Sequence, residues 1–248
     1  MLSAGDAGPA VVFVHGVGST AAIWKHQLRD LGDAYRCFAV ELRGNGSCKP
    51  EPDPATISRA GFADDVLAAA DAGQAVRFHF VGCSLGGAVG FELWRRAPER
   101  VASFTFVGSY AAYPDAEAYI RGIESAVGSA GTMETFARER ASQLGLTPER
   151  AAETIAQMAA KTRESYLATT RATWSGDYRA ILPSITVPTL VICGRRDRIA
   201  PVERSREIAN GIPGARLEIL EEAGHIANAD NPAAFNRLLR IFLEAQPL

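Results

Sequence analysis

Ser84 stands between glycines in the segment Gly82-Cys83-Ser84-Leu85-Gly86. A serine hydroxyl attacks carbonyl groups when a neighbouring base takes its proton. The spacing is that of a nucleophile elbow, a sharp strand-to-helix turn that strains the serine backbone and leaves no room for nearby side chains. Gly82 and Gly86 would provide that room. A five-residue match also arises by chance in a chain with 23 glycines, so the surrounding segments must decide.

The segments on either side of this pentapeptide have the character that an elbow requires. Phe78 to Val81 is a short apolar run typical of a buried strand, and Ala88 to Arg96 has helical character before Pro98. The first turn of a helix carries free N–H groups and the positive end of its dipole. The context therefore predicts a nucleophile and part of an anion site at one place.

Asp197 and His225 could complete the chemistry of Ser84. A serine nucleophile needs a base, and the base needs a carboxylate that holds it in the correct tautomer. Asp197 follows the apolar run Val187 to Cys193, and His225 follows the predicted strand Arg216 to Leu220. A lone histidine or aspartate is usually structural. Three matching strand ends in the order Ser, Asp, His instead predict a catalytic triad.

The elements that must position these residues alternate along the chain. Apolar strand-like runs alternate with amphipathic helical stretches, which predicts an α/β fold with a doubly wound, mostly parallel sheet. The remaining predicted strands are Ala10 to Val14, Tyr35 to Leu42, Arg77 to Cys83 and Val101 to Val107.

The stretch between Ser109 and Leu182 has a different pattern. It is rich in Ala, Glu, Arg and Gln, and it predicts three or four amphipathic helices with no strand. We therefore expect a core domain over residues 1–108 and 183–248, with a helical cap over residues 109–182 inserted in it. The numbers of acidic and basic residues in this stretch are nearly equal, which indicates that its charged side chains face solvent rather than form a binding patch. Its aromatic residues are expected to pack against neighbouring side chains rather than contact a ligand.

The chain resembles the α/β-hydrolase family over nearly its whole length. This resemblance implies an oxyanion hole formed by the backbone N–H groups of Val17 and Leu85, a structural role for His15, and substrate entry between the sheet and the cap. The segments that carry the resemblance are Val14-His15-Gly16-Val17-Gly18, Arg43-Gly44-Asn45-Gly46-Ser47, Gly82-Cys83-Ser84-Leu85-Gly86-Gly87, Pro98-Glu99-Arg100-Val101, Val187-Pro188-Thr189-Leu190, Gly194-Arg195-Arg196-Asp197 and Ala223-Gly224-His225.

The C-terminal third is most similar to 3-oxoadipate enol-lactonases, through Ile212-Pro213-Gly214-Ala215, His225-Ile226-Ala227-Asn228 and Asn231-Pro232-Ala233-Ala234-Phe235-Asn236. The resemblance implies a serine hydrolase, a carboxylesterase or lactonase, that cleaves a small carboxylic ester or lactone through an acyl-enzyme. Carbon-carbon bond hydrolases and cofactor-free haloperoxidases have the same fold, and both are alternative functions. A non-catalytic ligand receptor built on this fold is a hypothesis of a different class. Dehalogenases and epoxide hydrolases are disfavoured, because they carry aspartate at the position of Ser84.

A carbon-carbon bond hydrolase would need polar cap side chains that face a substrate carboxylate. The sequence offers four candidates without indicating which of them faces inward: Arg121, Arg138, Arg140 and Arg171.

Two further features depart from the family pattern. Glu41 precedes Leu42-Arg43-Gly44 where the family usually has aspartate. In addition, Met1 to Ala10 is too short for the antiparallel β-hairpin that usually precedes the first parallel strand. The strand Tyr35 to Leu42 would then be an outer edge with unpaired backbone groups. We expect a partner chain, as in a homodimer, or the loop Lys49 to Thr56 to cover this edge.

The bulk composition excludes several other classes. The chain has 248 residues, of which 47% are hydrophobic, and this composition is typical of a globular protein. Its formal net charge of −2 and its pI near 6.1 favour a small molecule as the partner rather than nucleic acid or a membrane. No apolar run approaches the roughly 18 residues of a transmembrane helix, so we expect a cytoplasmic location. We expect no cofactor. The four histidines show no metal-binding spacing, and Cys37, Cys48, Cys83 and Cys193 predict free buried thiols, with Cys83 filling space rather than acting as a second nucleophile.

Overall fold

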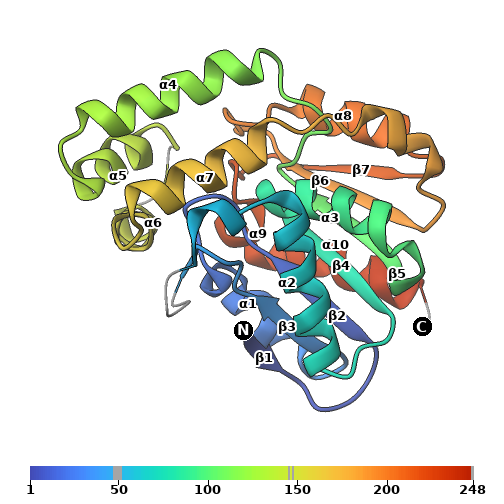
Figure 1. The fold of residues 1–248 in the computed structure, drawn as a ribbon. Coiled ribbons are helices and arrows are strands. Elements are labelled where there is room, and N and C mark those ends of the chain that lie inside the picture. Colours follow the sequence, from blue (N-terminus) through green and yellow to red (C-terminus); the bar gives the residue numbers. More distant parts are fainter. Residues whose placement is uncertain (47–51, 145, 147, 247–248) are drawn as a thin grey trace.

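One seven-stranded sheet, in the order β1-β3-β2-β4-β5-β6-β7, forms the centre of the molecule (Figure 1). It is seen in a computed structural model that describes residues 1–46, 52–144, 146 and 148–246. Strands β2 to β7 run parallel and β1 is antiparallel, so the predicted doubly wound, mostly parallel sheet is confirmed. The strands are β1 (Leu2–Ala4), β2 (Ala10–Val14), β3 (Arg36–Val40), β4 (Phe78–Cys83), β5 (Val101–Val107), β6 (Thr189–Gly194) and β7 (Arg216–Leu220).

Helices cover both faces of the sheet. Helices α1 (Lys25–Leu31) and α10 (Pro232–Glu244) pack on one face, with the short α9 (Ala227–Asp230) beside α10. Helices α2 (Arg59–Ala72), α3 (Leu85–Arg96) and α8 (Val202–Gly211) pack on the other. Because both faces are covered, every residue of β2, β4, β5 and β6 is buried, and these strands are mostly apolar. Four short 3-10 turns lie in the connections between these elements: η1 (Ala21–Trp24), η2 (Pro54–Thr56), η3 (Pro98–Arg100) and η4 (Arg179–Ser184).

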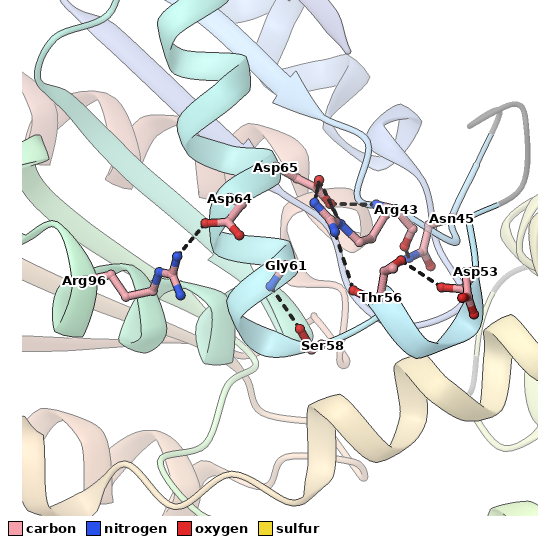
Figure 2. A network of polar contacts seen from close by, with 9 residues as sticks. All are labelled: Arg43, Asn45, Asp53, Thr56, Ser58, Gly61, Asp64, Asp65 and Arg96. Carbon is pink, nitrogen blue, oxygen red and sulfur yellow. Dashed lines mark hydrogen bonds and ion pairs between the residues drawn. The ribbon is translucent and has the colours of Figure 1, made fainter.

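Ser58 caps the beginning of helix α2. The Ser58 hydroxyl accepts a hydrogen bond from the Gly61 N–H at 3.1 Å, and Figure 2 shows this contact. Such a side chain satisfies one of the N–H groups that the first helical turn leaves without a partner.

Arg43 fastens the loop after β3 to helix α2. Its guanidinium donates to both oxygens of Asp65, and the Arg43 backbone N–H donates to Asp65 Oδ2 at 2.8 Å (Figure 2). On the other side of the same helix, Arg96 of α3 forms an ion pair with Asp64 at 2.6 Å. Bidentate arginine-carboxylate contacts fix geometry as well as charge, so they hold the position of Arg43 relative to α2.

The segment between β5 and β6, residues 109–182, which we call the cap segment, is helical. Its helices are α4 (Ala116–Ser129), α5 (Met133–Ser142), α6 (Pro148–Ala159) and α7 (Arg163–Trp174), and they form a layer beyond one end of the sheet (Figure 1). An isolated antiparallel bridge joins Ala112 to Asp177, and the Tyr178 N–H donates to the Ala111 carbonyl at 2.8 Å. The two ends of the segment are therefore held side by side.

The prediction that the strand Tyr35 to Leu42 forms an outer edge was wrong. The strand forms as β3, but β1 pairs with it in antiparallel register, with Ser3 opposite Phe38. The physical reason is that three residues suffice to occupy an edge, although they are too few for a hairpin. Along Cys37 to Ala39 the edge is therefore covered by β1. Of the segment Lys49 to Thr56, residues 49–51 lie outside the described residues.

Among the described residues, every helix is too short or too polar to cross a bilayer.

Candidate active site

Ser84 occupies a strained turn between β4 and α3. Its φ of 54° and ψ of −111° are unusual for a residue with a side chain, and such a conformation costs roughly 1–3 kcal/mol. A Cβ atom on Gly82 would lie 2.4 Å from the Gly86 carbonyl oxygen, and one on Gly86 would lie 2.4 Å from the Val14 carbonyl oxygen. Only glycine fits at these two positions, and the tight contacts hold the serine in place.

The strand order brings the loop after β2 next to this turn. Strand β2 lies between β3 and β4, and Val14 pairs with Gly82, so both strands end at the same edge. The chain leaves β2 toward β3 and returns to β4 on the opposite side. Open parallel sheets bind ligands at such a switch point.

His225 and Asp197 form a buried pair at the same edge. His225 Nδ1 lies 2.8 Å from Asp197 Oδ2, and the side chains are 11% and 0% exposed. Asp197 Oδ1 accepts the N–H groups of Ile199 and Ala200, each at 2.8 Å. Because the carboxylate can only accept, Nδ1 carries the proton and Nε2 keeps its lone pair. That is the tautomer that a general base requires.

Ser84 and His225 line one cavity. In the described part of the chain the Ser84 hydroxyl has no hydrogen-bond partner, so the serine and the imidazole face the same space without being bonded to each other. Hydrogen bonds of this kind are often long in enzymes without substrate and tighten when substrate binds. The three residues singled out from the sequence are thus brought together at one end of the sheet.

Val17 and Leu85 are the two residues whose backbone N–H groups the family resemblance assigns to an oxyanion hole. Val17 lines the cavity and Leu85 begins helix α3, and neither N–H donates to another group in the described residues. His15 Nδ1 lies 2.9 Å from the Gly16 carbonyl oxygen, to which the Ser19 N–H also donates. Since the carbonyl and the following N–H of a trans peptide point in opposite directions, this bond turns the Val17 N–H away from His15.

His15 is a fixed, neutral residue. Its Nε2 accepts the Leu42 N–H at 3.3 Å, so both ring nitrogens are engaged. Burial lowers the pKa of His15 to about 3, and the charge of Lys161 acts in the same direction. The ring therefore cannot serve as a general base near neutral pH, which fits a structural role.

The Glu41 side chain packs against the segment from His15 to Ala21, which follows β2. Its Oε1 accepts the Ala21 N–H at 3.2 Å and lies 3.6 Å from His15 Nε2, and burial raises the pKa of its carboxyl group. A Cβ atom on Gly46 would lie 2.1 Å from this carboxyl group, so Gly46 makes room for the longer acid. The longer acid is thus accommodated in the packing of this loop.

Apolar residues of the cap segment form the roof of the cavity. Met158, Tyr166 and Trp174 line it together with Ser84. Trp174 stacks on Tyr110 with ring centroids 4.8 Å apart, and further aromatic rings surround it. The aromatic residues therefore pack, as expected, but two of them also face the cavity.

Cys83 lines the cavity as a buried thiol. It is 1% exposed, and burial raises the pKa of its thiol well above the ordinary range. The prediction of free buried thiols is confirmed for Cys37, Cys83 and Cys193, whereas Cys48 lies outside the described residues. Within the described ranges, no three His, Cys, Asp or Glu side chains are grouped so as to hold a metal ion.

Arg140 is the only arginine among the cavity-lining residues of the described chain. The three other candidate arginines form ion pairs on the exposed surface: Arg121 with Glu117, Arg138 with Glu134 and Arg171 with Glu124. Sequence reasoning did not distinguish these four. Helical spacing does distinguish Arg140, because it lies four positions after Phe136 and three after Ala137, on the buried face of α5.

The doubly wound sheet, the strained serine and the paired histidine define an α/β protein of the nucleophile-elbow class. The chain belongs to the α/β-hydrolase fold family, whose model matches residues 9–232.

Known proteins of this family resemble the chain over most of its length. "Putative carbamate hydrolase RutD" of Pseudomonas syringae pv. syringae is 30% identical, covering 96% of this chain and 95% of the relative. The 3-oxoadipate enol-lactonase 2 of Acinetobacter baylyi is 27% identical, covering 95% and 89%. The structure of a thermophilic esterase from Thermogutta terrifontis has a TM-score of 0.89 at 25% identity, covering 100% of this chain and 93% of that one.

Proposed function

We propose that the protein hydrolyses a small carboxylic ester or lactone through an acyl-enzyme. The observation that carries this proposal is the placement of a strained, cavity-facing Ser84 beside a histidine whose Nδ1 is bound by a buried carboxylate. The esterase and enol-lactonase names of the relatives support the same class of substrate.

In the proposed reaction, His225 Nε2 takes the proton of the Ser84 hydroxyl as the serine oxygen attacks the carbonyl carbon. The protonated histidine then gives this proton to the leaving alcohol, or to the ring oxygen of a lactone. Water attacks the resulting ester of Ser84 with the same base, which releases the acid and restores the serine. Asp197 holds the imidazole throughout and stabilises its charged form.

The negative charge of each tetrahedral intermediate falls on the former carbonyl oxygen. We assign the Val17 and Leu85 N–H groups as its donors, because both are free and one begins a helix whose dipole favours an anion. A single donor of this kind typically lowers the barrier by about 3 kcal/mol.

Residues 109–182 act in this proposal as a cap over a core formed by residues 1–108 and 183–248. The substrate lies between the two, since the cavity takes its floor from the sheet edge and its roof from the cap segment.

Carbamate hydrolysis is a second candidate. It is favoured by the relatives named as carbamate hydrolases, the first of which is 30% identical over nearly its whole length. The same serine, base and oxyanion donors would serve, with nitrogen rather than oxygen in the leaving group. Parallel assays with esters, lactones, enol-lactones and carbamates would separate the two.

Ser84→Ala tests the mechanism directly. Without the hydroxyl no acyl-enzyme can form, so turnover of p-nitrophenyl acetate should fall by roughly 10³-fold or more and labelling by a fluorophosphonate probe should disappear. Cys83→Ala, which changes the adjacent thiol, is the matched control and should keep both activities. Undiminished turnover by Ser84→Ala, with an unchanged circular dichroism spectrum, would refute the assignment.

A further inference from the structure

Arg140 places a positive charge in an otherwise apolar part of the cavity. The cap side of that cavity is lined mainly by Ile123, Leu144, Met158 and Trp174. The Arg140 side chain is half-buried, and a guanidinium remains protonated at any working pH. Taking a charge out of water is costly unless an opposite charge compensates it.

The surroundings of Arg140 do not provide that opposite charge. Its Nη2 donates to the Tyr119 hydroxyl at 2.6 Å and its Nη1 to Gln143 Oε1 at 3.1 Å, and both acceptors are neutral. In the described residues Arg140 has no carboxylate within ion-pair distance, whereas its helix neighbour Arg138 is paired with Glu134 at 2.6 Å. An arginine that faces a cavity without a carboxylate suits a ligand that brings one.

Arg140 also borders a second hollow on the outer side of the cap segment. This groove lies between α4 and α5, and it shares Ile123 and Arg140 with the cavity over Ser84. Tyr119 and Phe136 line the groove as well. Glu139 of α5 lines the groove too, and the two shared side chains border both the groove and the inner cavity.

We propose that Arg140 binds a carboxylate of the substrate, so that the enzyme selects esters or lactones that carry a second, ionised carboxyl group. The proposal rests on the function proposed above and specifies its substrate class. Arginine is suited to this task because its planar guanidinium can donate two parallel hydrogen bonds to one carboxylate. The reacting carbonyl then lies at Ser84 while the charged end lies under α5.

Two esters of equal acyl length test this selection: mono-p-nitrophenyl adipate, which carries the carboxylate, and p-nitrophenyl hexanoate, which does not. Arg140→Gln should lower kcat/KM for the adipate ester roughly 10- to 100-fold and change it less than about threefold for the hexanoate. Arg140→Lys should restore part of the loss, since it keeps the charge but not the two-pronged geometry.

Arg138→Gln is the matched control, because Arg138 lies on the same helix with an exposed ion pair, and it should affect neither ester. Equal losses on both esters in Arg140→Gln would mean that the residue only supports the cap. No loss on either would mean that it does not meet the substrate. Both results overturn the proposal.

A binding measurement separates this proposal from the catalytic one. Calorimetry of mono-p-nitrophenyl adipate with Ser84→Ala needs no turnover, and adding Arg140→Gln should weaken binding roughly 10- to 100-fold. If the parent protein hydrolysed neither ester, the proposed function would fail while calorimetry still decided the role of Arg140. Equal affinities of the two variants would reject the carboxylate site and leave the Ser84 result intact.

Discussion

Gly108 lies directly after β5 and touches the paired histidine and aspartate. Its φ is 50°, and a Cβ atom there would lie 2.6 Å from the His225 carbonyl oxygen and 3.1 Å from Asp197 Oδ2. The missing side chain therefore creates the space in which the pair is held. This glycine is part of no sequence motif considered above, because its role depends on contacts from distant segments.

Gly108→Ala should impair catalysis beyond its effect on stability. The positive φ alone costs roughly 1–2 kcal/mol of unfolding free energy, and the contact with His225 should displace the imidazole and lower kcat by roughly 100-fold. Gly214→Ala is the control, since its φ is 75° but a Cβ atom there meets nothing within 4 Å. It should lose stability and keep its kcat. Urea unfolding and steady-state kinetics on both variants check this, and full activity of Gly108→Ala would contradict it.

The contrast between Ser84 and Arg140 shows what can be predicted at the level of residues. Ser84, Asp197 and His225 could be singled out because each follows a strand whose end is visible in the sequence. Arg140 differs from Arg121, Arg138 and Arg171 only in which helix face it occupies, and a composition argument treats them all as solvated charges. Once Phe136 and Ala137 are known to be buried, the helical periodicity of α5 places Arg140 on the buried face and Arg138 on the exposed face.

At the level of elements, strand β4 carries a buried histidine that the chemistry does not use. His79 is fully buried, its Nδ1 lies 2.8 Å from Ser103 Oγ, and its Nε2 has no hydrogen-bond partner in the described part of the chain. Burial lowers the pKa of His79 to about 4, with a smaller contribution from the charge of Arg77. The folded protein thus keeps this ring neutral at pH values where the unfolded chain would protonate it.

This histidine makes the stability depend on pH. Because its folded pKa is below the unfolded value of 6.5, its contribution is complete above pH 6.5 and is lost as pH falls toward 4. The double variant His79→Leu/Ser103→Ala lacks this titration, so its unfolding free energy should fall by roughly 2 kcal/mol less than the parent's between pH 7 and about 4.5. Urea titrations at several pH values measure the two slopes, and identical slopes would count against the assignment.

Most elements were predictable because their patterns are local. Strands β2, β5 and β7 have the bounds that the strand-like runs indicate, and β3 is shorter than predicted. Strand β1 was missed because Leu2–Ala4 has no apolar run, and only pairing with β3 makes it a strand. Helix α9 was not predicted, because its four residues are too few for a periodic signal.

At the scale of the whole molecule, β1 is the outer strand of the sheet beside β3. A variant that lacks residues 1–4 would expose the unpaired backbone groups of β3, and exposed edges pair with other chains. We expect it to be less stable and to form larger species at concentrations where the parent does not. Light scattering after size-exclusion chromatography measures this, with Leu2→Ala, which keeps the backbone pairing, as the control. An unchanged mass distribution would show that β1 does not protect the edge.

The closure between Ala112 and Asp177 has a consequence for engineering. Because the bridge and the Tyr178 N–H to Ala111 bond hold both connections together, the helical segment leaves the core and returns to it at a single point. Recombination with other members of the family could therefore use these two positions as junctions. The exchanged cap segment would change the side chains that line the cavity over Ser84. Substrate selectivity could then be varied while the core that carries Ser84 stays unchanged.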